Sequence, residues 1–241
     1  MAINSKYTFL KEELIIHTAG KLMKRIEERF PKSGLAQIGR ELHQLCINTQ
    51  DQTKILKRPI WYIRIPVYII ILALVYLLFK GCSFILELYS LHELNVSDIL
   101  QGIESGINEI IFVALVIYFI YNLEGRLKRR MALKFLHHLR SLAHVIDMHQ
   151  LTKDPTQHLM DHSTTESSPD RELNKFELIR YLDYCSEILA ITGKLAALYA
   201  QYMNDSVILS AVNDIETTTQ NLSNKIWQKI MILDLSGKPL D

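Results

Sequence analysis

The stretch IPVYIIILALVYLLF, residues 65–79, contains no charged side chain, and a second stretch, IIFVALVIYFIYNL at 110–123, has the same character. Apolar side chains surround each predicted helix instead of forming one stripe, which is typical of a helix that faces lipid. A bilayer span needs ~20 residues, but Lys and Arg side chains near its ends can snorkel and so lengthen a usable span. We therefore predict two membrane spans, at about 62–86 and 103–124.

Charged residues divide between the flanks of this pair and the segment inside it. The flanks are basic, with Lys54, Lys57, Arg58 and Arg64 before the first stretch and Arg126, Lys128, Arg129, Arg130 and Lys134 after the second. The segment between the stretches is mainly acidic, with Glu87, Glu93, Asp98, Glu104 and Glu109. Because Lys and Arg favour the cytoplasmic side of a membrane, this pattern predicts a multi-pass protein of an inner or plasma membrane with both termini in the cytoplasm.

The rest of the chain also predicts helices. Only six Pro and nine Gly occur among 241 residues, and apolar residues recur at helical spacing. We expect an all-α fold, with a two-span transmembrane helical hairpin and a cytoplasmic helical bundle. The expected parts are N-terminal cytoplasmic helices at 1–58, the transmembrane hairpin at 59–124, a cytoplasmic extension of the second span at 125–153, a polar linker at 154–170 and a C-terminal antiparallel helical hairpin at 171–235.

Helix boundaries follow from breakers and capping residues. Between Ile107 and Lys153 the one breaker candidate is Gly125, so a single long helix is expected to run through the second span and beyond it. Ser33 is the expected N-cap of a soluble helix that leads toward the first span. The first helix of the C-terminal pair is expected to begin with a cap at Ser168 or Asp170.

The last helix carries a coiled-coil-like seam. Its members are spaced mostly four and three residues apart, at Ile208, Val212, Ile215, Thr219, Leu222, Ile226 and Ile230. Such spacing predicts one apolar face that packs against a partner helix. Trp227 lies beside this seam, and we expect it in the core, with contact to a partner as the alternative. This coiled-coil-like helix and the polar outer ends of the hairpin together favour a homo-oligomer.

Polar residues near the outer ends of the two spans form a second group of interest. Lys80 lies about as far from Arg64 as Glu109 lies from Glu124, so an antiparallel pair of helices would bring Lys80 and Glu109 to similar depth. An ion pair between them would reduce the free-energy cost of placing either charge near the bilayer. The alternative is a membrane pore or cation path that includes Glu104. Its candidate lining residues are Lys80, Ser83, Glu104, Asn108, Glu109 and Asn122.

Histidines cluster after the second stretch. Six of the nine in the chain are His137, His138, His144, His149, His158 and His162. On a helix, His144 and Asp147 share a face, and His158 and His162 are four residues apart, which suits a divalent transition metal. The candidate metal ligands are therefore His144, Asp147, His158 and His162. The alternative is an ordinary polar face on which these side chains form pairs.

Other chemistry has no support in the sequence. A formal net charge of +1 argues against a general nucleic-acid binder, and no Walker A, GxGxxG, GxSxG or CxxC motif is present. We expect partners in the lipid bilayer, in further copies of the chain and in a cytoplasmic protein. The expected function is a cytoplasmic helical sensor, scaffold or regulatory domain coupled to the membrane hairpin. The alternatives are an oligomeric ion channel or pore-forming effector, and a membrane-anchored metal-binding protein or enzyme that uses the histidine-rich segment 137–162.

Overall fold

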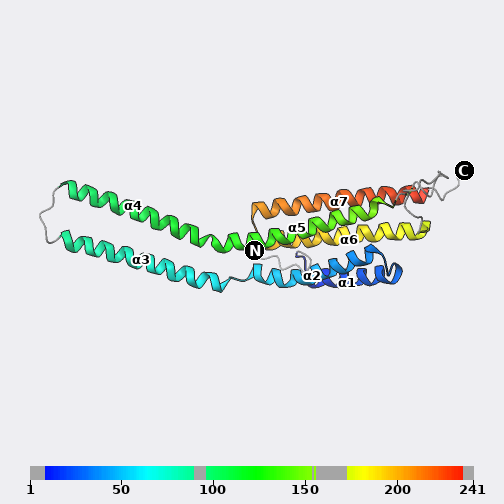
Figure 1. The fold of residues 1–241 in the computed structure, drawn as a ribbon, viewed down its shortest axis with the longest axis horizontal. Helices are drawn as coiled ribbons and strands as arrows, with labels where there is room; N and C mark the ends of the chain where they lie inside the picture. Colours follow the sequence, from blue (N-terminus) through cyan, green and yellow to red (C-terminus); the bar gives the residue numbers. More distant parts are fainter. Residues whose placement is uncertain (1–8, 90–95, 154, 156–172, 236–241) are drawn as a thin grey trace. The chain divides into compact units, whose positions relative to one another are not determined.

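The computed structural model describes residues 9–89, 96–153, 155 and 173–235. Within these residues the protein contains seven α-helices and no strand (Figure 1), so the all-α prediction is confirmed. The helices are α1 (Glu12–Arg29), α2 (Gly34–Lys57), α3 (Trp61–Tyr89), α4 (Val96–Tyr121), α5 (Leu123–Leu151), α6 (Lys175–Tyr202) and α7 (Ser206–Leu235).

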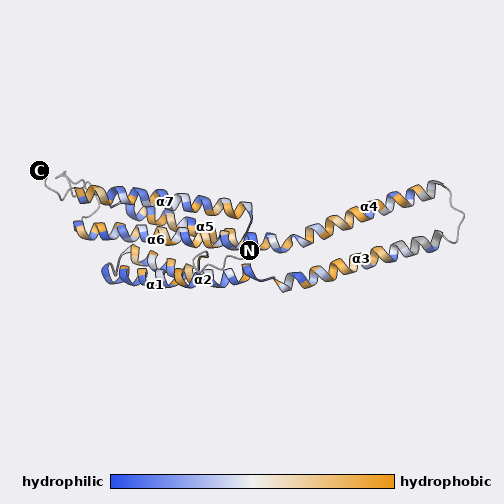
Figure 2. Ribbon diagram, turned by 180° about the vertical axis from the view of Figure 1, so that it is seen from behind, coloured by the Kyte–Doolittle hydropathy of each residue, from blue (hydrophilic) through white to orange (hydrophobic). Residues whose placement is uncertain are grey.

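The chain divides into two compact units. The first, called the bundle here, contains α1, α2, α6, α7 and the part of α5 that begins at Met131. The second, the α3–α4 unit, runs from Arg58 to Arg130 and includes the first residues of α5. Large apolar side chains lie inside the bundle but on the surface of α3 and α4, and Figure 2 shows how strongly apolar these two helices are.

Helix α6 is the central element of the bundle. It contacts α1, α2 and α7, and the ring of Tyr199 on α6 stacks on Phe135 of α5 with centroids 4.8 Å apart. The hydroxyl of Tyr199, which is completely buried, donates a hydrogen bond of 3.1 Å to Oε1 of Gln52 on α2. A helix with neighbours on several sides must be apolar around most of its circumference, which explains the dense run of apolar residues in this part of the sequence.

The α6–α7 pair confirms the predicted seam. Ile208, Val212, Ile215, Thr219, Leu222 and Ile226 are buried, and Ile230 is partly buried against the core. Gly193 lets the two backbones approach, because a Cβ at this position would lie 3.1 Å from Oγ1 of Thr219. The expectation for Trp227 was wrong, since its side chain is 53% exposed. Its neighbour Ile226 points into the core, and the ~100° rotation per residue of a helix turns Trp227 outward.

Capping residues locate the helix starts. The backbone N–H of Ala36 donates to Oγ of Ser33 at 3.2 Å, as expected for an N-cap of α2. Helix α6 begins with a capping box, in which Asn174 and Glu177 each accept a hydrogen bond from the other's backbone N–H at 2.9 Å. The cap of α6 is therefore Asn174 in place of the expected Ser168 or Asp170, which lie outside the described residues.

One helix from Ile107 to Lys153 was expected, and the structure interrupts it at a single residue, across which the backbone N–H of Asn122 still donates to Tyr118 and that of Arg126 to Asn122. Helix α4 ends at Tyr121 and α5 begins at Leu123, with Asn122 between them. The side-chain amide of Asn122 donates to the carbonyl oxygen of Tyr118 at 2.7 Å, and its backbone N–H donates to the same oxygen at 3.2 Å. An Asn side chain that competes for a carbonyl in this way disturbs helix geometry locally, so the interruption falls at Asn122 and not at Gly125.

Two helical segments are long and apolar enough to cross a membrane, Arg64–Gly81 and one within Leu100–Leu151. Helices α3 and α4 run antiparallel next to each other (Figure 1) and contain no buried residue among those described. Side chains such as Leu72 and Phe112 are 73% and 70% exposed. Among the described residues, α3 and α4 therefore present a large apolar surface, which is weak evidence for membrane association.

An ion pair and a cation–π contact connect three helix ends in the bundle through Lys57. Nζ of Lys57 at the end of α2 donates to Oε1 of Glu12 at the start of α1 at 2.7 Å, and lies 4.2 Å from the ring centroid of Tyr202 on α6. Partial burial works to raise the pKa of Glu12. Hydrogen bonds from Lys57, from the backbone of Glu12 and from Tyr202, together with the charge of Lys57, outweigh it, so the pKa lies below its ordinary value. The hydrogen bond to Glu12 correspondingly raises the pKa of Lys57.

Replacing Glu12 by Gln is expected to remove a pH-dependent part of the stability of the bundle. Because folding lowers the pKa of Glu12, its contribution to stability is present above the unfolded-state pKa and is lost as pH falls through the folded-state pKa. The contribution of Lys57, whose pKa is raised, is present at neutral and acidic pH and is lost only in alkali. Glu12→Gln should therefore cost up to about 1 kcal/mol at neutral pH and nothing once Glu12 is protonated. Thermal unfolding between neutral and strongly acidic pH tests this, and two parallel pH curves would contradict it.

Candidate functional site

A carboxylate lies at the base of the α3–α4 unit, where α3 begins and α4 gives way to α5. The side chain of Glu124 is only 13% exposed. Its Oε2 accepts a hydrogen bond from Nε of Arg64 at 2.6 Å, and its Oε1 lies 2.9 Å from Nζ of Lys128. Oε1 also accepts from the backbone N–H of Ile60 at 3.3 Å, and Lys128 donates further to the carbonyl oxygen of Arg58 at 2.8 Å. We call Arg58, Ile60, Arg64, Glu124 and Lys128 the Glu124 cluster.

The local sequence explains why these groups meet. Pro59 has no backbone N–H and separates α2 from α3. Ile60 follows it immediately before α3, so its N–H is one of the donors that a helix start leaves without a partner inside the helix. Glu124 lies in the first turn of α5 and supplies the missing acceptor. A negative side chain is thus placed at the start of α3, where the helix dipole favours it.

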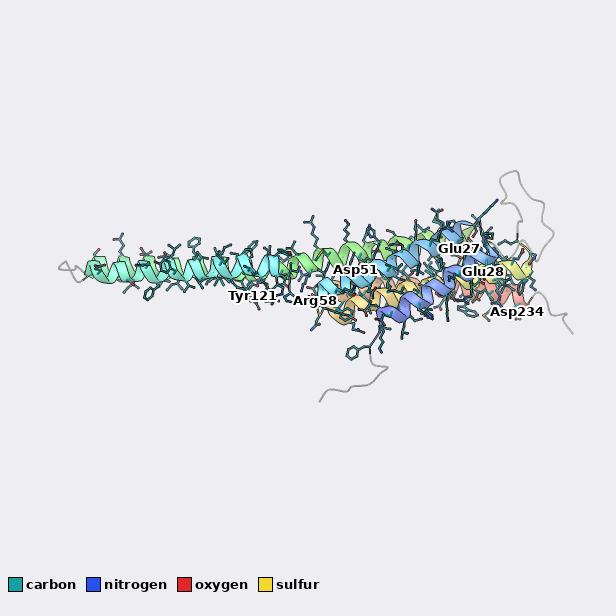
Figure 3. The ribbon with its side chains drawn as sticks, turned by 90° about the horizontal axis from the view of Figure 1, so that it is seen from below. Glu27, Glu28, Asp51, Arg58, Tyr121 and Asp234 are labelled. Atoms are coloured by element: carbon teal, nitrogen blue, oxygen red, sulfur yellow. The ribbon has the colours of Figure 1, made fainter. Side chains whose placement is uncertain are left out.

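The Glu124 cluster borders a cavity of about 350 Å³ within the α3–α4 unit. Both helices contribute to its lining, which consists of Arg64, Val67, Tyr68, Ile120, Tyr121, Asn122, Glu124, Gly125 and Lys128. The lining includes cationic and hydroxyl-bearing side chains as well as aliphatic ones. Arg58 and Tyr121 lie at the same end of the unit (Figure 3). This combination of charge and apolar wall suits an amphiphilic ligand better than a metal ion or a small polar substrate.

The charges in the cluster do not cancel. Arg64 and Lys128 provide two cations against the single carboxylate of Glu124. Further arginines lie close in sequence, at Arg58, Arg126, Arg129 and Arg130. The guanidinium of Arg126 lies 4.5 Å from the ring centroid of Phe119. The base of the unit therefore carries a net positive charge that is partly held in fixed positions.

Sequence reasoning did not identify the Glu124 cluster. Arg64 and Lys128 were interpreted only as topology signals, and Glu124 only as the end of a span. A signal was present, because Glu124 is the one acidic residue in an otherwise basic flank and lies four residues before Lys128. The depth alignment that matched Lys80 with Glu109 also matched Arg64 with Glu124, and the structure forms the second pair.

The predicted polar group at the other end of the α3–α4 unit has a different outcome. Lys80 on α3 and Glu104 and Glu109 on α4 are all exposed. Within the part of the chain that the structure describes, Lys80 and Glu109 form no ion pair with each other. Of the other candidate pore residues, Ser83 donates to the carbonyl oxygen of Phe79 at 2.8 Å in its own helix. The pore interpretation therefore stays a prediction.

The candidate metal ligands lie only partly in the described residues. His144 and Asp147 are on α5, where Oδ1 of Asp147 accepts a hydrogen bond from Nε2 of Gln150 at 2.7 Å. His158 and His162 lie outside the described residues. Among residues that are described, no group of three or more His, Cys, Asp or Glu side chains is arranged to hold a metal ion. A metal site in segment 137–162 remains a prediction.

No protein family, curated protein or solved structure matches this chain. The function must therefore be inferred from the chemistry of the two units themselves. The two features that call for an explanation are the exposed apolar surface of α3 and α4 and the cationic cavity at their base.

Proposed function

We propose that this chain is an integral membrane protein in which α3 and α4 cross the bilayer and the bundle is a cytoplasmic sensor, scaffold or regulatory domain. The observation that carries the proposal is the exposure of large apolar side chains around α3 and α4. Burying one such side chain contributes ~1.5–3 kcal/mol. Transfer of the whole surface into lipid is therefore favourable by on the order of tens of kcal/mol, whereas the bundle already has its own core.

The base of the α3–α4 unit has the composition of a cytoplasmic membrane interface. Trp61, Tyr62 and Tyr121 are 60%, 93% and 73% exposed, and such amphipathic rings favour the headgroup region. Arg64 lies within one helical turn of Trp61 in the sequence of α3, and Lys128 lies two turns after Tyr121. The topology with both termini in the cytoplasm follows from placing this basic end inside.

Helix α5 supports a regulatory role for the bundle. Its first turn contains Glu124. Farther along the helix, Phe135, Leu139 and Ile146 are buried in the bundle core. A ligand or protein that shifts α5 in the bundle thus acts on the same helix that supplies Glu124 to the base of α3. In the proposed function, this helix is the connection through which a cytoplasmic event reaches the membrane.

Cysteine labelling in cells tests the topology. The native thiols of Cys46 and Cys185 are suitable as silent background, because burial raises the pKa of each to about 12 and thiolate is the reactive form. The variants are made in a background in which Cys82 is replaced by Ser. In cells whose cell wall or outer membrane has been removed but whose inner or plasma membrane is intact, a membrane-impermeant maleimide should label Ser97→Cys, since Ser97 lies in α4 before the apolar stretch, on the outer side in the proposed topology. The matched variant Asn213→Cys, exposed on α7, should react only after the membrane is permeabilised.

Two results would contradict the proposed function. One is release of the chain from membranes by alkaline carbonate, which extracts peripheral proteins and leaves spanning helices in place. The other is equal labelling of Ser97→Cys and Asn213→Cys before permeabilisation. Either result would assign the apolar surface of α3 and α4 to a protein partner and not to lipid.

An oligomeric pore is the second candidate function. It is favoured by Lys80, Glu104 and Glu109, which are exposed on otherwise apolar helices. Charged side chains within spans usually face other helices or water, so further copies of the chain would provide their surroundings. Conductance of the purified chain in planar bilayers, reduced in the variant Glu109→Gln, would support the pore. A chain that remains monomeric in nanodiscs and does not conduct would contradict it.

A further inference from the structure

The guanidinium of Arg64 is held by a hydrogen bond at Nε, and its two Nη atoms are available to a ligand. Its Nε donates to Glu124, which orients the planar group. Its two Nη atoms make no hydrogen bond within the described residues, and the side chain is 43% exposed at the edge of the cavity. An arginine held in this way offers a pre-organised pair of donors to an oxyanion, and phosphate is a preferred partner of that geometry.

The remaining lining of the cavity favours a ligand with an anionic and an apolar part. Lys128 adds positive charge, and the hydroxyl-bearing rings of Tyr68 and Tyr121 also line the cavity. Val67 and Ile120 form an aliphatic wall, one residue from each helix. A free inorganic anion would leave that wall in contact with water, whereas a phospholipid covers it with its glycerol and first acyl carbons.

The structure points to a binding site for the phosphodiester headgroup of an anionic phospholipid in the cavity between the bases of α3 and α4. We propose that Arg64 contacts the phosphate through its Nη atoms, with Glu124 positioning the guanidinium and Lys128 supplying charge. This inference rests on the proposed function, because it requires α3 and α4 to lie in a bilayer. It goes further by naming the lipid chemistry that the base of the unit recognises.

The test is lipid retention by the full-length chain. The protein is assembled in nanodiscs with equal amounts of phosphatidylglycerol and phosphatidylcholine, and lipids that remain bound are identified by native mass spectrometry. We expect retention of phosphatidylglycerol over phosphatidylcholine, and a loss of about tenfold in that preference for Arg64→Gln, since a charge-assisted hydrogen bond is removed. Excess inorganic phosphate should not displace the lipid.

Matched variants separate a defined site from general attraction to anionic lipid. Arg126→Gln removes the same charge close to the cavity, but Arg126 does not line it, so the preference should change less than about twofold. Val67→Phe keeps every charge and fills the cavity, and it should reduce the preference as strongly as Arg64→Gln does. This second variant keeps the test valid if Arg64→Gln disturbs folding.

Specific outcomes would overturn the inference. Equal losses for Arg64→Gln and Arg126→Gln would show diffuse electrostatic attraction, and displacement by inorganic phosphate would show a simple anion site. A chain that resists carbonate extraction but retains both lipids equally would remove this inference and leave the membrane topology intact. A chain that carbonate extracts would remove the proposed function as well.

Discussion

Glu124→Ala is expected to destabilise the α3–α4 unit by about 2 kcal/mol. The substitution removes the acceptor shared by Arg64, Lys128 and the backbone N–H of Ile60. It leaves two cations close together without their counter-charge and the start of α3 without its cap. Thermal unfolding in detergent, together with the rate of tryptic cleavage after Lys57, would measure the effect. An unchanged melting temperature and cleavage rate would contradict it.

A double-mutant cycle can isolate the Arg64–Glu124 interaction. Glu124→Gln keeps a neutral acceptor at the same position and should cost less than Glu124→Ala. When it is combined with Arg64→Gln, the loss should be smaller than the sum of the two single losses, because neither charge is then left without a partner. Strict additivity would mean that the 2.6 Å contact between Nε of Arg64 and Oε2 of Glu124 contributes nothing of its own.

Tyr199→Ala should have the largest effect in the bundle, about 3–5 kcal/mol. Tyr199 is completely buried, and it connects three helices through its stack on Phe135 and its hydrogen bond to Gln52. Truncation would leave a cavity at the centre of the core and an unpaired amide on α2. Chemical denaturation of the full chain, followed by the circular dichroism of its helices, is the appropriate measurement.

Two control substitutions separate the loss of the hydrogen bond and the loss of an exposed aromatic ring from the loss of the buried ring. Tyr199→Phe retains the stack and loses only the hydrogen bond, so it should cost about 1 kcal/mol. Phe176→Ala truncates another aromatic residue of α6 that is 57% exposed, and it should cost less than about 1 kcal/mol. If all three variants unfold at the same denaturant concentration, Tyr199 does not have the central role assigned to it.

Periodicity was sufficient to predict the helices of the bundle. The seam of α7 was predicted residue by residue from Ile208 to Ile226, because a spacing of three and four defines one face whatever the partner is. Single side chains that interact with their own backbone were harder to foresee. The stop at Asn122 and the capping box at Asn174 depend on hydrogen bonds that compete with other local choices.

The Glu124 cluster shows where sequence reasoning was insufficient. Arg64 and Glu124 are 60 positions apart, and no local pattern connects them. A depth alignment of the two apolar stretches placed Arg64 and Glu124 at similar depth. Membrane topology alone explains the basic flanks, so it gave no reason to expect a role for the single acidic residue among them. The cavity beside it depends on the register of two helices, which composition alone does not provide.

The attachment of Glu124 to the start of α3 also has a consequence for biosynthesis. A nascent chain that has grown only through the first apolar stretch contains Arg64 and the N–H of Ile60, but the carboxylate that satisfies both lies 60 residues after Arg64 and has not yet been added. Until the second stretch is translated, the first helix has an unneutralised cation and an uncapped start at its base. In the proposed topology, the two helices are therefore expected to enter the membrane as one hairpin, with translation of Glu124 completing the insertion.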